Sequence, residues 1–327
     1  MDKKMLLSAL ALMLVITSSC SSDDGSSDRG NWKERSVFDG IPRSNAASFL
    51  INDKAYMGTG YDGDDYLNDF WEYNIEGDYW AQKADFPGIE RSSSSAFAID
   101  NKGYLGIGYD GDNELNDFWE YNPNSNTWTQ KANFGGGNRR DAVGFASNTN
   151  GYIGTGHDGD NDKKDFWKYT PSLDEWEELV GFGGDKRKDA STFIINDEVY
   201  LVAGVSNGLY KDDFWKFNPQ TELWTRLRDI DYDDDNYIFR SNAVGLTING
   251  LGYLVSGYNV GALSTTWEYN PLNDEWEEIT PLEGFARQDA TGFSYNNRGF
   301  VLLGRNGSLY LDDNYELFPQ EEYDDED

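Results

Sequence analysis

Residues 103–122 read GYLGIGYDGDNELNDFWEYN, and closely related stretches occur at a constant distance on both sides. Residues 55–74 read AYMGTGYDGDDYLNDFWEYN and residues 151–170 read GYIGTGHDGDNDKKDFWKYT, each offset by 48 residues. Three weaker copies follow, in which Trp215, Trp267 and Tyr315 take the place of Trp119. Six copies at nearly constant spacing indicate a repeat architecture, because each copy is one supersecondary unit that buries its apolar face against the next.

Each copy contains four short β-rich runs that are separated by turn residues. In the second copy the runs are SSSAFAID, GYLGIGY, NDFWEYN and TWTQKA, with turn sequences such as Asn122-Pro123-Asn124-Ser125 between them. Four strands in every 48 residues predict one blade of a β-propeller, so we expect six blades. The recurring aromatic residues are expected to form the core, where a ring of one blade covers a glycine of its neighbour.

These features resemble the kelch repeat over about residues 31–319: a glycine-rich second strand, a Tyr-Asp-Gly turn, and a Tyr and a Trp at fixed spacing. The resemblance implies an all-β, six-bladed propeller with four antiparallel strands in each blade. The kelch family has a Gly-Gly doublet where this chain has GTG, GIG, VAG, VSG and LLG, so the first glycine is often replaced. The expected blades are residues 43–86, 91–134, 139–182, 187–230, 240–282, and 287–318 together with 31–38.

The two ends of the repeat region are expected to complete one blade together. Trp32 lies 48 residues before Trp80, so its segment matches a fourth strand that has no first three strands before it. Residues 290–318 supply three strands, and the acidic residues 320–327 are expected to be a disordered tail. Pairing the N-terminal strand with the last blade removes the exposed sheet edges of an open ring.

The N-terminus has the layout of an export signal. Lys3 and Lys4 precede a twelve-residue apolar run that is too short to span a bilayer. Residues 1–19 resemble the signal peptide of a bacterial lipoprotein, with Cys20 as the lipid-bearing residue; the alternative is an ordinary cleaved signal with an incidental cysteine. Residues 20–30 form an acidic tether whose start resembles the surface-export signals of Gram-negative lipoproteins. The expected location is therefore the outer membrane, held only by the lipid anchor.

The composition excludes several classes of function. The 327 residues include 27 Lys and Arg and 59 Asp and Glu, which gives a net charge of −32. Phosphate binding requires clustered cations, so a nucleic-acid partner is excluded. One His and one Cys exclude a disulfide framework, a Cys/His zinc site and the centre of the copper-radical oxidases related to this fold. No cofactor is expected, and the chain is expected to be a monomer.

One arginine precedes the first strand of every blade. An aspartate opens the third strand in five blades, Asp117 in blade two for example, whereas blade five has Thr265. The arginines predict either an electropositive throat for a carboxylate or other anion, or a set of structural pairs with the aspartates. Repetition through all six blades favours the pairs, and it leaves the arginine of blade five without its repeat partner. The six residues are Arg43, Arg91, Arg139, Arg187, Arg240 and Arg287.

Three loops in blades one to three contain the sequence Asp-Gly-Asp. Alternating carboxylates on such a loop can bind Ca²⁺, but these loops lack the closing Glu of an EF-hand. We therefore expect solvated acidic loops and no high-affinity Ca²⁺ site. The weak candidate ligands are Asp62, Asp64, Asp110, Asp112, Asp158 and Asp160.

Aromatic residues at the start of the loops between the second and third strands are further candidates for ligand contact. Tyr61, Tyr109 and Tyr258 occupy this position in blades one, two and five, and His157 replaces the aromatic residue in blade three. A lone His in place of an aromatic residue is more typical of packing or surface roles than of a catalytic base.

One loop breaks the repeat symmetry. The segment between Trp224 and Arg240 is five residues longer than its counterpart in the preceding blade. Asymmetric loops on a symmetric scaffold often have a function, and this one contributes Tyr232 and Tyr237; the alternative is a tolerated acidic insertion.

These observations predict a non-enzymatic binding module that presents its loops to a glycan or protein partner outside the cell. No catalytic residues are identified. A first alternative is a carbohydrate isomerase or mutarotase that resembles the kelch epimerases of sialic acid, for which an arginine throat would suit the carboxylated sugar. A second alternative is a purely structural surface protein. Fold alone does not decide among them.

Overall fold

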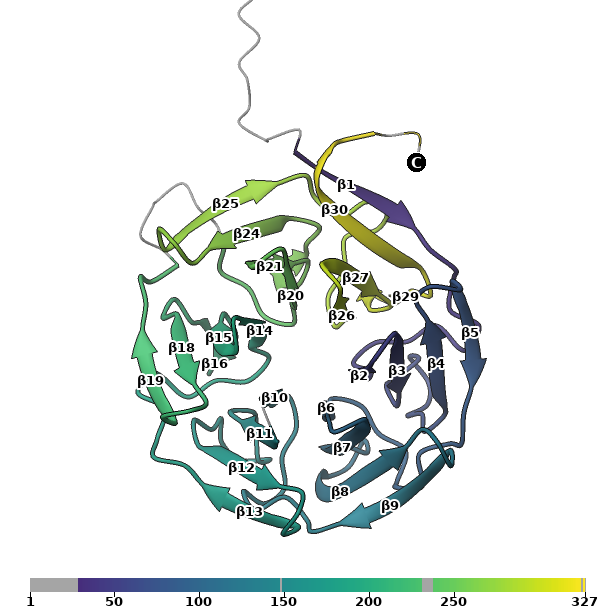
Figure 1. Ribbon diagram of the computed structural model, residues 1–327, viewed down its shortest axis with the longest axis vertical. Coiled ribbons are helices and arrows are strands. Elements are labelled where there is room, and N and C mark those ends of the chain that lie inside the picture. The colour runs from purple at the N-terminus through teal and green to yellow at the C-terminus, as the bar shows by residue number, and fades with distance from the viewer. Residues whose placement is uncertain (1–28, 148, 231–237, 325, 327) are drawn as a thin grey trace, which may run out of the picture.

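The computed structural model describes residues 29–147, 149–230, 238–324 and 326. They form six four-stranded antiparallel sheets arranged around a central axis (Figure 1), which confirms the six-bladed propeller that the repeats predict. None of the described residues is helical, and accordingly they contain no helix that could cross a membrane.

Blades one to three each consist of four consecutive strands, with the first strand next to the axis and the fourth at the periphery (Figure 1). Blade one contains β2 (Ala47–Ile51), β3 (Lys54–Gly58), β4 (Phe70–Asn74) and β5 (Tyr79–Gln82). Blade two contains β6 (Ser95–Ile99), β7 (Lys102–Tyr109), β8 (Glu114–Asn122) and β9 (Thr127–Lys131). Blade three contains β10 (Val143–Ser147), β11 (Asn150–Gly154), β12 (Phe166–Thr170) and β13 (Glu175–Glu178).

Blades four to six add a small two-stranded hairpin between their second and third strands. Blade four contains β14 (Ser191–Ile195), β15 (Glu198–Val202), β18 (Trp215–Asn218) and β19 (Leu223–Arg226), with the hairpin β16 (Val205–Ser206) and β17 (Leu209–Tyr210). Blade five contains β20 (Val244–Ile248), β21 (Leu251–Val255), β24 (Thr266–Asn270) and β25 (Glu275–Ile279), with the hairpin β22 (Tyr258–Asn259) and β23 (Gly261–Ala262). Blade six contains β26 (Thr291–Tyr295), β27 (Arg298–Leu302) and β30 (Asn314–Glu322), with the hairpin β28 (Arg305–Asn306) and β29 (Leu309–Tyr310).

The N-terminal strand closes the ring, as the repeat pattern predicts. β1 (Arg29–Glu34) is the fourth strand of blade six and pairs with β30 from Arg29↔Glu322 to Glu34↔Tyr315. Trp32 is fully buried in this blade, and its indole donates to the carbonyl oxygen of Thr280 at 3.4 Å. β30 runs to Glu322, so the first three residues of the expected disordered tail belong to a strand, because β1 begins two residues earlier than expected and pairs with them.

The strand connections lie on two opposite faces because neighbouring strands in a blade are antiparallel. Connections between second and third strands share one face with the loops between blades, since Leu67 of the former bridges Arg91 of the latter. We call this the loop face, and the opposite side the turn face. The start of β1 lies on the turn face, because Arg29 pairs with the end of β30.

Aromatic rings of neighbouring blades form the core. Phe70 of blade one packs against Tyr121 and Trp128 of blade two, with ring centroids 4.8 and 4.9 Å apart. Phe49 lies over Gly103 of blade two, where a Cβ atom would approach the ring to 2.0 Å. This confirms that an aromatic ring of one blade covers a glycine of the next.

Candidate functional site

The six arginines lie between blades at the loop face, and each is at most 1% exposed. Arg91 donates to both carboxylate oxygens of Asp117, at 2.6 and 2.9 Å, and to the carbonyl oxygen of Ile107 at 3.0 Å. The equivalent ion pair is present in four other blades. A ligand could reach these guanidinium groups only by displacing the aspartates, so the geometry supports structural pairs and gives no open arginine throat.

In blades one and four the ion pair lowers the pKa of its aspartate. Burial alone would raise the pKa of Asp69, but the hydrogen bond and the charge of Arg43 outweigh it and lower that pKa. The pKa of Asp213 is lowered in the same way by Arg187. These carboxylates therefore stay ionised under ordinary conditions and are unsuited to proton transfer.

Blade five departs from this pattern. Arg240 donates from Nη2 to Thr265 Oγ1 at 2.9 Å and otherwise to the backbone carbonyl oxygens of Ile238, Ser256 and Thr265. Burial lowers the pKa of Arg240 to about 10. The structure thus confirms that the arginine of blade five has no aspartate at the repeat position. Among the described residues its guanidinium bonds only neutral oxygens, and the charge of Glu278 acts on it at a distance.

A ring of six residues surrounds the channel mouth on the loop face, each two positions after an arginine. All six have a left-handed backbone, with φ between 53° and 58°. Each N–H donates to the carbonyl oxygen of its counterpart in the adjacent blade, at 2.8 to 3.3 Å, so the hydrogen bonds close a ring. The residues, which we call the mouth ring, line a cavity of about 180 Å³: Asn45, Ser93, Asp141, Asp189, Asn242 and Asp289.

The side chains of the mouth ring break the sixfold symmetry. Lys188 Nζ lies 3.3 Å from Asp189 and 3.5 Å from Asp141, and Arg305 donates to Asp289 at 2.7 Å. Burial, followed by the nearby charge of Asp141, raises the pKa of Asp189 well above its ordinary value. Burial also raises the pKa of Asp289. Arg140 Nε also lies 3.6 Å from Asp141. The mouth therefore presents amide and carboxylate groups, with three cations beside its three carboxylates.

Aromatic side chains form a rim beside this ring over blades six, one and two. The ring centroid of Tyr61 lies 4.9 Å from that of Tyr66 and 6.1 Å from that of Tyr310. Tyr66 contacts Tyr109 at 6.0 Å, and the guanidinium of Arg140 lies 4.4 Å from the ring centre of Tyr109. The four tyrosines are partly exposed, so aromatic surface is available to a ligand.

The other predicted rim residues have different surroundings. His157 Nδ1 lies 2.9 Å from Asp162 Oδ1, and the other oxygen of that carboxylate accepts the N–H of Asn207 in blade four. His157 therefore helps to join two loops, as a packing residue would. Tyr258 occupies the equivalent position in blade five, is partly exposed, and pairs with Ser241 through the backbone.

The three Asp-Gly-Asp loops are held by their first aspartate. Asp62 Oδ1 accepts the N–H groups of Asp64 and Asp65, and Asp110 and Asp158 make the same turn. Burial alone would raise the pKa of Asp158, but the hydrogen bond from Lys163 and these N–H groups together outweigh it and lower that pKa to about 2. Within the described part of the chain, no three His, Cys, Asp or Glu side chains gather as a metal site.

Several predicted residues lie outside the described residues: the signal peptide, Cys20, Tyr232 and Tyr237. The flanks of the asymmetric loop are described. Ile230 and Ile238 are fully buried in the core between blades four and five.

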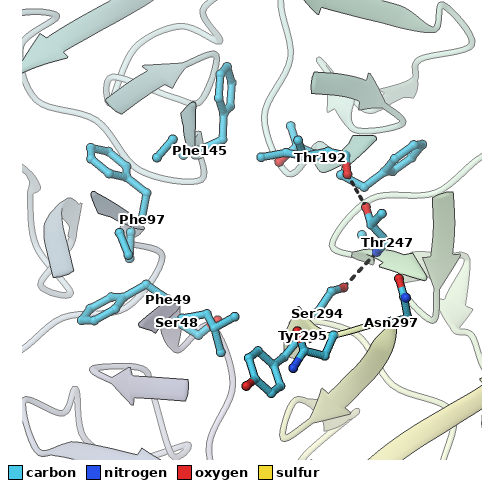
Figure 2. A pocket seen from close by; sticks show the side chains of 18 residues that line it. Ser48, Phe49, Phe97, Phe145, Thr192, Thr247, Ser294, Tyr295 and Asn297 are labelled. Carbon is cyan, nitrogen blue, oxygen red and sulfur yellow. Dashed lines mark hydrogen bonds between the residues drawn. The ribbon is translucent and has the colours of Figure 1, made fainter. Parts of the chain in front are cut away.

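The channel has a second mouth on the turn face, with a cavity of about 630 Å³. Figure 2 shows Thr192, Thr247 and Ser294 on one side of it. Thr247 Oγ1 donates to the carbonyl oxygen of Ile194 at 2.8 Å, and its N–H donates to Ser294 Oγ at 2.9 Å. These polar groups join neighbouring inner strands, so they are already bonded within the protein.

The mouth ring was not identified from the sequence. Its members vary among Asn, Ser and Asp, and all six have a left-handed backbone, which Asn and Asp tolerate better than most residues. The short polar residue that recurs two positions after each arginine is the signal that could have revealed it.

Comparison with known proteins agrees with this architecture. The family model of the Kelch motif matches residues 108–135 and 186–229. The solved structure of YjhT is similar to this chain with a TM-score of 0.75, covering 85% of this chain and 95% of that one at 16% sequence identity. At this identity the likeness concerns the fold alone. No curated protein matches the sequence significantly.

Proposed function

We propose that this six-bladed propeller with Kelch motifs is an exported, lipid-anchored binding protein that takes a glycan at the loop-face mouth of its channel. The observation that carries the proposal is the mouth ring with its tyrosine rim. Amide and carboxylate groups bond sugar hydroxyls, and aromatic rings pack against the apolar faces of sugars. A cavity of about 180 Å³ is below the size of drug-binding pockets and suits a single sugar unit or the end of a chain.

The path of the chain supports the anchored arrangement. β1 begins at Arg29 on the turn face, so a tether that ends there leaves the molecule opposite the mouth ring. A lipid on Cys20 would hold the turn face near the membrane and leave the loop face open to ligands. The export signal itself is a proposal from the sequence.

The isomerase alternative gains no support from this geometry. It required free arginines around a pocket, whereas five of the six bind aspartates and all six are buried. A purely structural role is the outcome expected if the mouth binds nothing.

The test is a glycan-binding screen of the mature chain from residue 21, followed by calorimetry with Ca²⁺ and with a chelator. Asn45→Ala removes one amide from the mouth ring and is expected to weaken binding by up to about tenfold. Asn296→Ala is the matched control, because Asn296 also lines the channel with a left-handed backbone but lies at the turn face. Its affinity is expected to equal that of the unmodified chain.

Two results would contradict the proposal. Binding of no glycan would leave a protein partner or a structural role. A glycan whose affinity falls with Asn296→Ala and not with Asn45→Ala would place the site at the opposite mouth.

A further inference from the structure

We propose that blade five contains a binding site for a compact monoanion, such as chloride or a carboxylate group, between Arg240 and Trp267. This site is separate from the mouth ring and does not depend on the proposed glycan function. It occupies the place where the other blades have an aspartate.

The other blades show what this place binds. In blade two, Asp117 Oδ2 accepts a hydrogen bond from Arg91 Nη2 at 2.9 Å and another from the indole of Trp119 at 2.8 Å. Blades one and three repeat this arrangement with distances of 2.7 to 3.0 Å. An anionic oxygen therefore bridges a guanidinium and an indole in three blades.

Blade five keeps both donors and lacks the anion. Arg240 is fully buried, and within the described part of the chain its guanidinium bonds only neutral oxygens. Trp267 is 4% exposed, and its indole N–H has no acceptor. A buried donor without an acceptor costs free energy, and so does a buried charge without a counterion. One small anion at the position of the missing carboxylate oxygen would satisfy both groups.

The site suits a single negative charge that arrives from solvent. Among the described residues, no carboxylate bonds the Arg240 guanidinium directly, and Glu278 of β25 acts on it only through its charge at a distance. One anion in direct contact is therefore sufficient to complete the pair. The paired aspartates of blades one, two, three and six are 21 to 23% exposed, which shows that this position lies within reach of solvent. Thr265, its neighbour in blade five, is also partly exposed. The anion can be a free ion, or a carboxylate carried by a ligand or partner.

Nuclear magnetic resonance of the ¹⁵N-labelled mature chain tests the site. Sodium chloride or sodium formate is titrated at constant ionic strength, with the sodium salt of a bulky sulfonate, such as 3-(N-morpholino)propanesulfonate, as the balancing salt. We expect a saturable shift of the Trp267 indole resonance, assigned by Trp267→Phe. At a tenfold excess over Kd, the melting temperature is expected to rise by about 3 °C.

Two variants provide matched controls. Thr265→Asp places a carboxylate in the site, so the Trp267 resonance and the melting temperature should no longer respond to either salt. Asp117→Thr recreates the blade-five arrangement in blade two, so the Trp119 indole should become sensitive to the anion.

Each outcome is informative. A response to both salts supports a general site for small monoanions, and a response to formate alone supports a site for carboxylates of larger molecules. The proposal is overturned if neither salt shifts the Trp267 resonance saturably, or if Thr265→Asp responds as the unmodified chain does.

Discussion

At the scale of single residues, the mouth ring brings together carboxylates whose burial lowers the stability of the folded protein. Asp141, Asp189 and Asp289 are largely buried, and Arg140, Lys188 and Arg305 lie beside them. Burying neighbouring carboxylates costs free energy. Natural proteins retain such costs mainly where function requires them, which is a reason to look for ligands here.

Asp189→Asn is expected to raise the free energy of unfolding at pH 7 by on the order of 1 kcal/mol. The folded pKa of Asp189 lies above its unfolded value, so between these two values the unfolded chain loses a proton that the folded chain keeps. The native carboxyl therefore lowers stability as pH rises above about 4, and the gain from the substitution should disappear below that pH.

Urea unfolding at pH 4 and pH 7 measures this difference. Asp112→Asn, on an exposed acidic loop, is the control and should leave stability unchanged at both values. A less stable Asp189→Asn variant at pH 7 would show that the carboxylate contributes more through Lys188 than burial costs.

At the scale of elements, the closure of blade six is the connection on which the whole ring depends. β1 supplies the fully buried Trp32 and covers the edge of β30. Without it, blade six would have three strands and a long unpaired edge.

A chain that begins at Val37 is expected to lose at least about 3 kcal/mol of stability, because removing one buried Trp costs that much by itself. The expected fall in melting temperature is about 10 °C. A chain that begins at Arg29 is the control and should melt like the full mature chain. Circular dichroism measures both, and equal melting temperatures would remove the argument for closure by β1.

The elements also show what could be predicted from sequence. The spacing of Trp32 and Trp80 was sufficient to predict the closing strand, because the repeat places one Trp on every fourth strand. The extension of β30 to Glu322 could not be predicted, since QEEYDDED has no apolar alternation. The arginine pairs could be predicted because each partner is the same residue type in at least five blades, whereas the mouth ring is harder to recognise because its positions vary among Asn, Ser and Asp.

At the scale of the whole molecule, the start of β1 and the proposed ligand site lie on opposite faces. Residues 21–28 can span at most about 28 Å, so a lipid on Cys20 would hold the propeller close to the bilayer. Because β1 starts on the turn face, the loop face would then point away from the membrane.

This orientation can be measured on lipid vesicles, because an acylated Cys20 leaves no other native cysteine to label. A dye on Leu272→Cys, at an exposed turn-face position, is expected to be quenched strongly by a quencher in the bilayer. A dye on Asp64→Cys, on the loop face, should be quenched several-fold less. Stronger quenching at position 64 would contradict the orientation, and absence of the protein from vesicles would contradict the anchor.

The pairing of β1 with β30 also imposes an order in time. A hydrogen bond joins residues 31 and 324, which are 293 positions apart. β1, the first described strand to be synthesised, can therefore pair only after β30, the last described strand, has been made. During synthesis, five blades can form while the sixth stays open, and its unpaired edge is then exposed to other chains. Any factor that assists the folding of this protein therefore has most to protect in the interval before β30 has been made.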